Sequence, residues 1–331
     1  KLVGVMGLKI PSALDDRYGF GASIPTEDRP VVFIGPYEHH SNELPWRESI
    51  ADLVIIDEAS MLSLSLMHRL IDALHPTAEL FLVGDPEQLA SVDAGTVLAD
   101  ISLAAKKEGT DLYRCTERLT SQYRYAVGSP IEQVVKAVQS GDSDQVINLL
   151  KSHRNSNGVV SWIDPSSKAQ EDLEAFENVG LEVQRHALEV VELAGSSQYE
   201  KALETLGQLQ LLCASRVGQL GIAGWNRTVN KWIGTATRKQ WFVGRPVLIT
   251  KNDHGNNLYN GDVGVVCSDK NGEVRVVFDG LGGPREFPTV RLPEVETVHA
   301  LTIHKSQGSE YQHAIVVLPT GRSRLMTREL L

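Results

Sequence analysis

Long apolar runs are missing from this chain of 331 residues. No stretch reaches the roughly 18 consecutive apolar residues that a membrane helix needs. The short apolar stretch Lys1–Lys9 is not followed by a small-residue cleavage signal, so it does not read as a targeting segment. We therefore expect a cytoplasmic protein with no membrane partner.

Cysteine is also scarce. Cys115, Cys213 and Cys267 lie far apart and lack the paired spacing of a zinc site. Cys213 lies within an apolar run and Cys267 follows one. This pattern predicts small core residues in a reducing compartment.

The chain has no excess of positive charge, since its formal net charge is −10. This balance argues against a protein that coats nucleic acid through bulk charge. It does not exclude a local basic track, because the affinity for nucleic acid depends on the residues that face phosphate.

The first half of the chain alternates strand and helix signals. Leu53–Ile56 reads as a buried strand, and Leu80–Val83 reads as a second one. Between them, apolar residues from Leu62 to Leu74 recur at helical spacing, with Ser60 as the expected N-cap. Val31–Ile34 is a weaker strand candidate. The pattern predicts a parallel sheet, which binds ligands at the carboxyl ends of its strands.

The second half of the chain changes character twice. Helices are expected over Ile131–Val138, Val146–Leu150 and Glu171–Leu193, and the last of these is acidic. A buried strand at Leu209–Ala214 follows. Short β-rich runs separated by Asn-Gly turns then predict a small antiparallel barrel, and two more buried strands come after it. These runs are Pro246–Thr250, Val263–Val266 and Val274–Phe278, with turns at Asn260-Gly261 and Asn271-Gly272, and the later strands are Val298–Ile303 and Ala314–Leu318.

Polar side chains follow both strands of the first sheet. At Asp57-Glu58, one carboxylate could hold Mg²⁺, directly or through water, while the next could activate the attacking water in phosphoryl transfer. The plainer interpretation is a surface pair that stabilises a helix N-terminus. Gln88 follows the second strand, and its amide could bond both a water and a phosphate oxygen. A Gly-Asp-Pro turn such as the one at Gly84 is uninformative by itself.

In combination, these strings resemble the RecD family of superfamily 1 helicases. Asp57-Glu58 lies in the counterpart of motif II, and Gly84–Gln88 lies in that of motif III. Downstream strings match in the same order, and the likeness covers roughly Ala51 to the end. They are Gln122–Arg124 (motif IV), Leu211–Asn226, Gly244–Gly264 (the family's inserted barrel) and Leu301–Glu310 (motif V).

The resemblance implies roles for individual residues. Gln88 would sense the γ-phosphate, and Arg124 would reach it with a fork that suits phosphate. Gly308 and Glu310 would face the nucleotide. Five residues would contact DNA: Arg216, Asn252, Thr302, His304 and Lys305. For the motif V string the plainer alternative is a polar turn between core strands.

Other residues are weaker candidates for a DNA track. Basic side chains are usually solvated surface, and for tryptophans a packing role is the more frequent one. The basic candidates are Arg227, Lys231, Arg245 and Lys251, and the tryptophans are Trp225, Trp232 and Trp241.

Two family elements are missing from the sequence. It contains no Gly-rich loop that ends in Gly-Lys-Ser/Thr, which would cradle the β/γ-phosphates. It also stops after Thr327-Arg328-Glu329-Leu330, a string that leads into motif VI in the family. We therefore expect a fragment of a longer helicase subunit, inactive by itself, rather than a degenerate protein.

The expected fold is α/β, with RecA-like parallel-sheet P-loop NTPase domains, the first incomplete, and an inserted SH3-like β-barrel. The expected segments are 1–125 (first motor domain), 126–244 (second motor domain), 245–295 (barrel) and 296–331 (return to the second domain). The resemblance implies an ATP- and Mg²⁺-dependent helicase that moves 5′-to-3′ on single-stranded DNA. It would act in double-strand break repair within an exonuclease V-type complex, with RecB-like and RecC-like subunits. The alternative is an ATPase-deficient DNA-binding or assembly module.

Overall fold

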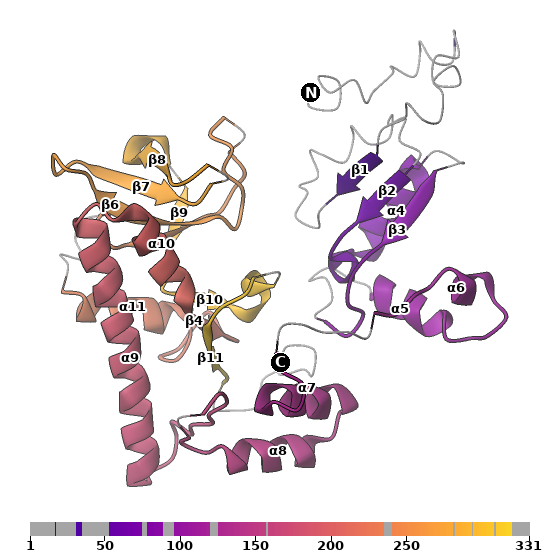
Figure 1. Ribbon diagram of the computed structural model, residues 1–331, viewed down its shortest axis with the longest axis horizontal. Coiled ribbons are helices and arrows are strands. Elements are labelled where there is room, and N and C mark those ends of the chain that lie inside the picture. Colours follow the sequence, from indigo (N-terminus) through magenta and orange to yellow (C-terminus); the bar gives the residue numbers. More distant parts are fainter. Residues whose placement is uncertain are drawn as a thin grey trace. The chain divides into compact units, whose positions relative to one another are not determined.

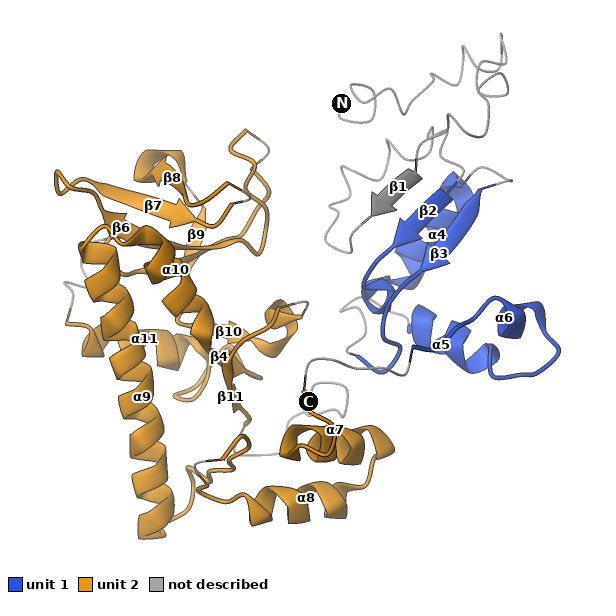
Figure 2. Cartoon of the chain, in the orientation of Figure 1, with its two compact units in different colours: residues 1–123 blue, residues 124–331 orange. Residues whose placement is uncertain are grey.

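The structure, a computed structural model, describes most of the chain from Leu53 onward. The chain divides into two compact units, Lys1–Tyr123 and Arg124–Leu331, and each is treated by itself (Figure 2). The described residues are 17, 31–34, 53–74, 78–88, 96–119, 125–156, 158–234, 240–253, 255–280, 282–292, 294–307 and 309–319. The predicted division into four segments stays a prediction.

The first unit is built on a parallel sheet. Its strands lie in the order β1 (Val31–Ile34), β2 (Leu53–Ile56) and β3 (Glu79–Leu82), all parallel (Figure 1). Helix α4 (Leu64–Ala73) connects β2 to β3, which confirms the predicted strand–helix–strand unit. Its core joins Val54 and Ile56 to apolar side chains of α4 and α5. Among the described residues this unit also contains η3 (Ala59–Met61), α5 (Val97–Ala104) and α6 (Asp111–Arg114).

The N-cap of α4 is Ser63, so the prediction of Ser60 is wrong. The Ser63 hydroxyl accepts a hydrogen bond from the Leu66 amide at 3.3 Å. Ser60 lies three residues earlier, buried within the 3-10 turn η3. Because the chain makes this turn directly after β2, the helix begins later than the apolar periodicity suggests.

A second parallel sheet forms the centre of the second unit. Its strands lie in the order β10 (Ala300–Thr302), β4 (Leu209–Cys213) and β11 (His313–Val317), all parallel. Cys213 is fully buried here, as is Cys267 in the neighbouring sheet. Burial raises the pKa of each thiol to about 12. Both cysteines are therefore uncharged core residues, as predicted.

An antiparallel sheet of five strands lies between α11 and β10 in the sequence. The predicted Asn-Gly turns form, with Gly261 at φ 104° and Gly272 at φ 81°, which suits glycine. No pairing between the edge strands β8 and β9 occurs among the described residues, so closure into an SH3-like barrel stays a prediction. In spatial order the strands are β8 (Arg285–Pro288), β7 (Val274–Phe278), β6 (Val263–Ser268), β5 (Pro246–Ile249) and β9 (Val295–Thr297).

The predicted strand Val298–Ile303 is confirmed with shorter bounds, since β10 occupies Ala300–Thr302 within it. Just before this run the chain forms β9, which belongs to the antiparallel sheet, whereas β10 belongs to the parallel sheet. Val298 and His299 lie between them. Val298 is buried although it lies outside both strands, so the apolar run begins before the strand does.

The long helix α9 (Gln170–Gly195) contacts both sheets of this unit (Figure 1). Val183 and Ala187 pack with the parallel sheet, while Val190 and Ala194 pack against β6 and β7. The three predicted helices are confirmed, and each is longer than its prediction. The remaining helices are α7 (Pro130–Ser140), α8 (Ser143–Ser152), α10 (Tyr199–Gln208), α11 (Ile222–Trp232), η4 (Thr289–Arg291) and η5 (Ile303–Ser306).

Candidate nucleotide and nucleic-acid sites

The acidic pair of the first unit lies at the carboxyl end of β2. Asp57 is exposed and follows the last strand residue directly. Glu58 adopts a left-handed conformation, with φ 52° and ψ 40°. A non-glycine residue in this region costs energy, and such conformations cluster at functional sites. The bend turns the chain out of the strand immediately after the two carboxylates.

The neighbouring strand end is joined to this bend through the backbone. The Ala59 amide donates to the Val83 carbonyl at 2.8 Å, and the Val83 amide donates to the Ile56 carbonyl at 2.8 Å. A Cβ on Gly84 would lie 2.8 Å from the Ala59 nitrogen. Only glycine therefore allows the two loops to approach this closely.

Gln88 lies in a small turn organised by Asp85. Oδ1 of Asp85 accepts from the Glu87 amide at 3.0 Å, and its carbonyl accepts from the Gln88 amide at 3.2 Å. The side-chain nitrogen Nε2 of Gln88 lies 3.5 Å from Oδ2 of Asp85. Asp57, Glu58 and Gln88 thus come from two adjoining strand ends of one sheet, as the pattern predicted.

The donor set of this edge fits a magnesium ion shared with a phosphate ligand. Oδ1 of Asp57 accepts the Glu58 amide at 2.9 Å, and Oδ2 makes no hydrogen bond among the described residues. Mg²⁺ is usually held by one or two carboxylates together with substrate phosphates. Asp57 can therefore serve as a single-carboxylate ligand.

A second polar edge lies at the carboxyl ends of β4 and β10. Arg216 is exposed and follows β4 by three residues. Thr302 ends β10, and its hydroxyl accepts from the Lys305 amide at 3.1 Å, which starts η5. Because β4 and β10 are parallel neighbours, the predicted DNA residues Arg216, Thr302, His304 and Lys305 gather at one edge.

The charges at this edge influence one another. Burial lowers the pKa of His304, and the positive charge of Arg216 lowers it further. At neutral pH the imidazole is therefore uncharged and can donate one hydrogen bond. Nζ of Lys305 lies 3.5 Å from Oε2 of Glu296, an exposed carboxylate on β9. An anion at this edge would compete with Glu296 for Lys305.

Helix α11 holds the Arg216 loop in place. The amides of Ile222 and Ala223 donate to the carbonyls of Ser215 and Arg216, at 3.1 and 3.2 Å. A Cβ on Gly221 would lie 2.2 Å from the Val217 carbonyl oxygen. The loop is thus folded tightly onto the start of the helix.

Several other candidates do not join this edge. Arg245 is buried, donating from Nε to the Thr297 hydroxyl at 2.9 Å and lying over the Trp241 ring. The prediction that Arg245 lies on a DNA track is therefore wrong, because its side chain is buried and bonds Thr297 of β9 from the residue directly before β5. Lys251 pairs with Glu294 at 2.7 Å on the surface. Oδ1 of Asn252 accepts from the Asn260 amide at 2.8 Å, within a loop of the antiparallel sheet.

The tryptophans serve packing. Trp225 is buried in the core of the second unit and meets Trp232 edge to face, with ring centroids 6.3 Å apart. Trp241 packs against the core of the antiparallel sheet. The packing interpretation therefore describes all three.

Some predicted site residues cannot be placed. Arg124 and Gly308 lie outside the described residues, so their roles stay predictions. Glu310 is described and exposed, three residues before β11 begins at His313. Its role at the ribose also stays a prediction.

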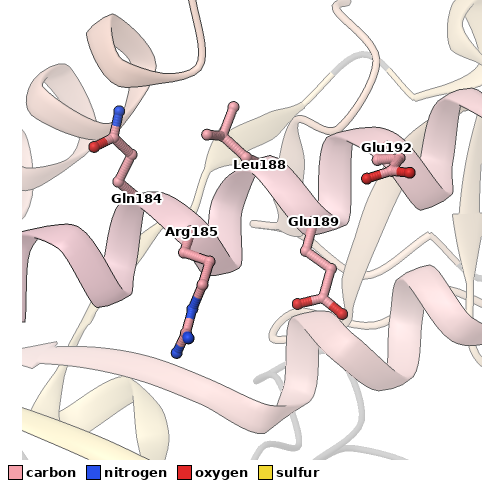
Figure 3. A pocket seen from close by; sticks show the side chains of 5 residues that line it. All are labelled: Gln184, Arg185, Leu188, Glu189 and Glu192. Atoms are coloured by element: carbon pink, nitrogen blue, oxygen red, sulfur yellow. The ribbon is translucent and has the colours of Figure 1, made fainter.

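A shallow hollow of the second unit lies along α9 (Figure 3). All five of its lining residues come from this one helix, and none is a predicted site residue. The lining residues are Gln184, Arg185, Leu188, Glu189 and Glu192.

None of the described helices is both long and apolar enough to cross a lipid bilayer.

Asn226 is the residue that sequence reasoning missed. It appeared only as the end of a matching string. In the structure its side-chain amide bonds the backbone at three points where the chain passes from β9 to β10. A lone asparagine on an amphipathic helix carries no sequence signal for such a role.

Comparisons with known proteins agree with these observations. A family model described as "AAA domain" matches residues 34–163. The RecBCD enzyme subunit RecD of Mycolicibacterium smegmatis is 40% identical over 296 residues, covering 88% of this chain and 48% of that protein. The RecBCD enzyme subunit RecD of Mycobacterium tuberculosis H37Rv is 41% identical over 284 residues, covering 85% of this chain and 47% of that protein.

A more distant relative carries a related name. The ATP-dependent RecD2 DNA helicase of Deinococcus radiodurans is 30% identical over 289 residues, covering 84% of this chain and 34% of that protein. The chain thus spans about half the length of the RecD relatives it matches. With this likeness over most of its length, and with motifs II, III and V in the expected order, the chain belongs to the RecD-like family of superfamily 1 helicases.

Proposed function

We propose that this chain is part of an ATP-driven motor that translocates on single-stranded DNA. The observation that carries the proposal is the backbone junction between the ends of β2 and β3. It brings the carboxylates of Asp57 and Glu58 to the same sheet edge as the Gln88 loop. The related protein of D. radiodurans is named an ATP-dependent DNA helicase, which supports the same reaction.

Each residue at this edge has a proposed role in phosphoryl transfer. Asp57 holds Mg²⁺, which neutralises charge on the phosphates when bound. Glu58 orients the attacking water and accepts its proton. Gln88 hydrogen-bonds the terminal phosphate. Arg124 stabilises the negative charge that develops on this phosphate during transfer. Gly308 and Glu310 complete the nucleotide contacts.

The DNA is proposed to lie along the other edge, in the second unit. Arg216, Lys305 and the neutral imidazole of His304 offer hydrogen-bond donors to backbone phosphates, with Thr302 beside them. Asn252 extends this track in the proposal. The mycobacterial relatives are named subunits of a RecBCD enzyme, which supports assembly with RecB-like and RecC-like subunits. The proposal also includes 5′-to-3′ movement and a role in double-strand break repair.

The test is DNA-stimulated ATP hydrolysis. It compares the 331-residue chain with the same chain extended at both ends by the corresponding segments of the M. smegmatis relative. We expect hydrolysis in the extended chain, and we expect Glu58→Gln to lower its kcat by about a hundredfold or more, since a positioned general base contributes that much. Glu87→Gln is the matched control, because Glu87 lies near the same edge but pairs with Arg118 at 2.9 Å.

Two outcomes would contradict the motor. One is an extended chain that binds single-stranded DNA without hydrolysing ATP, which would leave a DNA-binding module. The other is an equal loss of activity in Glu87→Gln and Glu58→Gln, which would remove the specific role of Glu58.

A further inference from the structure

The two loops that carry the proposed DNA contacts belong to different elements. Arg216 follows β4 and is folded onto the start of α11, while Thr302 ends β10 and His304 and Lys305 follow it. Phosphate recognition by both loops needs a fixed spacing between them. The pairing of β4 with β10 sets the distance between the two strands, and a further contact is needed to hold α11, onto which the Arg216 loop folds, against β10.

Asn226 provides this connection. It lies on α11, four residues after the start of the helix. Its Oδ1 accepts from the His299 amide at 2.9 Å and from the Ala300 amide at 3.2 Å. Its Nδ2 donates to the Thr297 carbonyl at 3.1 Å. One side chain thus bonds the last residue of β9, the first residue of β10 and the link between them.

The bond to Ala300 acts close to the DNA loop. β10 has three residues, and its third, Thr302, starts the turn that carries His304 and Lys305. Because a strand rises about 3.3 Å per residue, Asn226 grips the backbone roughly 7 Å from the start of that turn. Only two strand residues separate the backbone that Asn226 bonds from the turn, so the turn has little conformational freedom relative to Asn226.

A second side chain of α11 contacts the link between β9 and β10, but it bonds a side chain there and not the backbone. Oδ1 of Asn230 accepts from Nε2 of His299 at 3.0 Å. Burial, with the nearby charges of His186 and Arg245, lowers the pKa of His299 to about 3, so its ring is neutral. Asn230 therefore holds the imidazole, whereas Asn226 holds the chain.

We propose that Asn226 is a positioning residue that sets the spacing between the Arg216 loop and the Thr302–Lys305 turn. It acts through the backbone of His299 and Ala300 and touches neither DNA nor nucleotide itself. The inference rests on the proposed DNA edge of the second unit.

The test measures affinity for a fluorescent oligothymidine. It compares the parent 331-residue chain with four variants that are prepared in the same way. Asn226→Ala removes all three bonds and is expected to weaken binding about tenfold. Asn226→Asp keeps the two accepted bonds that hold β10 and loses the bond to Thr297, so we expect less than a threefold loss. Asn230→Ala, one helical turn away, is the matched control with less than a twofold loss. Lys305→Ala reports on the DNA edge itself.

A spectroscopic readout separates positioning from general stability. In Asn226→Ala the NMR titration of His304 should move toward higher pH, because Arg216 is no longer held beside it. Asn230→Ala should leave this titration unchanged.

The outcomes are distinguishable. If Lys305→Ala binds as the parent does, the proposed DNA edge fails and the inference fails with it. If Lys305→Ala weakens binding while Asn226→Ala binds normally, only the role of Asn226 is overturned. An equal loss in the two Asn226 variants, or in Asn226→Ala and Asn230→Ala, would also overturn it. Should Asn226→Ala not fold, a loss of more than threefold in folded Asn226→Asp overturns the inference, and retention of binding there supports it.

Discussion

The position of Gly84 requires glycine because of the backbone of the neighbouring strand end, and not because of the turn in which Gly84 lies. A methyl group there would lie 2.8 Å from the Ala59 nitrogen and 3.1 Å from the Ser60 nitrogen. Backbone atoms cannot move aside as a flexible side chain can. The closeness of the motif II and motif III loops thus depends on the absence of one Cβ.

We predict that Gly84→Ala destabilises the first unit by roughly 1–3 kcal/mol, the usual cost of overpacking. The measurement is urea unfolding followed by circular dichroism. Gly207→Ala is the control, since Gly207 lies in α10 with open space around its Cα. That change should stabilise the protein by about 0.5–1 kcal/mol, because alanine favours helix. Equal effects of the two changes would contradict the close approach at Gly84.

Residue chemistry was the part most open to prediction from the sequence. Asp57, Glu58 and Gln88 stand at strand ends because carboxyl ends of parallel strands meet at one edge, a rule that needs only the strand pattern. Arg245 shows the limit. Its charge suggested a surface role, but its burial depends on Thr297, 52 positions away in the sequence. Such long-range pairing has no local signal.

At the scale of elements, the start of α4 shows how a turn displaces a helix. The apolar periodicity begins near Leu62, yet the 3-10 turn η3 occupies the residues before the helix. Ser63 therefore caps α4, and the hydroxyl of Ser60 is buried without a hydrogen-bond partner among the described residues. Two serines three positions apart have opposite energetic roles.

This pair gives a sharp prediction. Ser63→Ala should destabilise the first unit by about 1 kcal/mol, the typical loss of an N-cap. Ser60→Ala should change its stability by less than about 0.5 kcal/mol, because it removes a buried hydroxyl that has no partner. Thermal unfolding of both variants measures the difference. A larger loss for Ser60→Ala would mean that the cap is at Ser60.

The sequence predicted the strand in the run Val298–Ile303, but not the point just before it where the chain passes from one sheet to the other. Alternation and burial identify a strand, but they do not say which sheet the strand joins. The change of sheet between Thr297 and Ala300 is fixed by Asn226, which lies more than 70 positions earlier. Hairpins with Asn-Gly turns were predictable for the opposite reason, since their signal is local.

At the scale of the whole molecule, the protein and its proposed ligand carry net charge of the same sign. The chain carries a formal net charge of −10, and DNA is an anion. Binding then depends on the few cations at the carboxyl edge of β4 and β10, because counterion release counts only residues that face phosphate. Added salt therefore weakens this binding, because it reduces the free energy gained when counterions leave the phosphates.

We predict a linear fall of log K for oligothymidine with log salt concentration. Arg216→Ala should reduce the slope by about 0.7, the value for one phosphate contact on a single strand. Arg185→Ala removes an exposed arginine from α9 and should leave the slope unchanged. Fluorescence titrations at several salt concentrations measure both. Identical slopes in all three proteins would exclude Arg216 from the DNA edge.

The two ends of the antiparallel insertion lie side by side, with Val247 paired to Thr297. Viewed in isolation, such a segment could be lost or gained in evolution as a self-contained module, since joining its ends would need only a short link. Its packing says otherwise. Val265, Cys267 and Val277 of the insertion form one core with Val190, Ala194 and Ala202 of α9 and α10. Deleting the sheet would leave those helices with a bare apolar face, so the insertion and the α9–α10 pair can be inherited or exchanged only together.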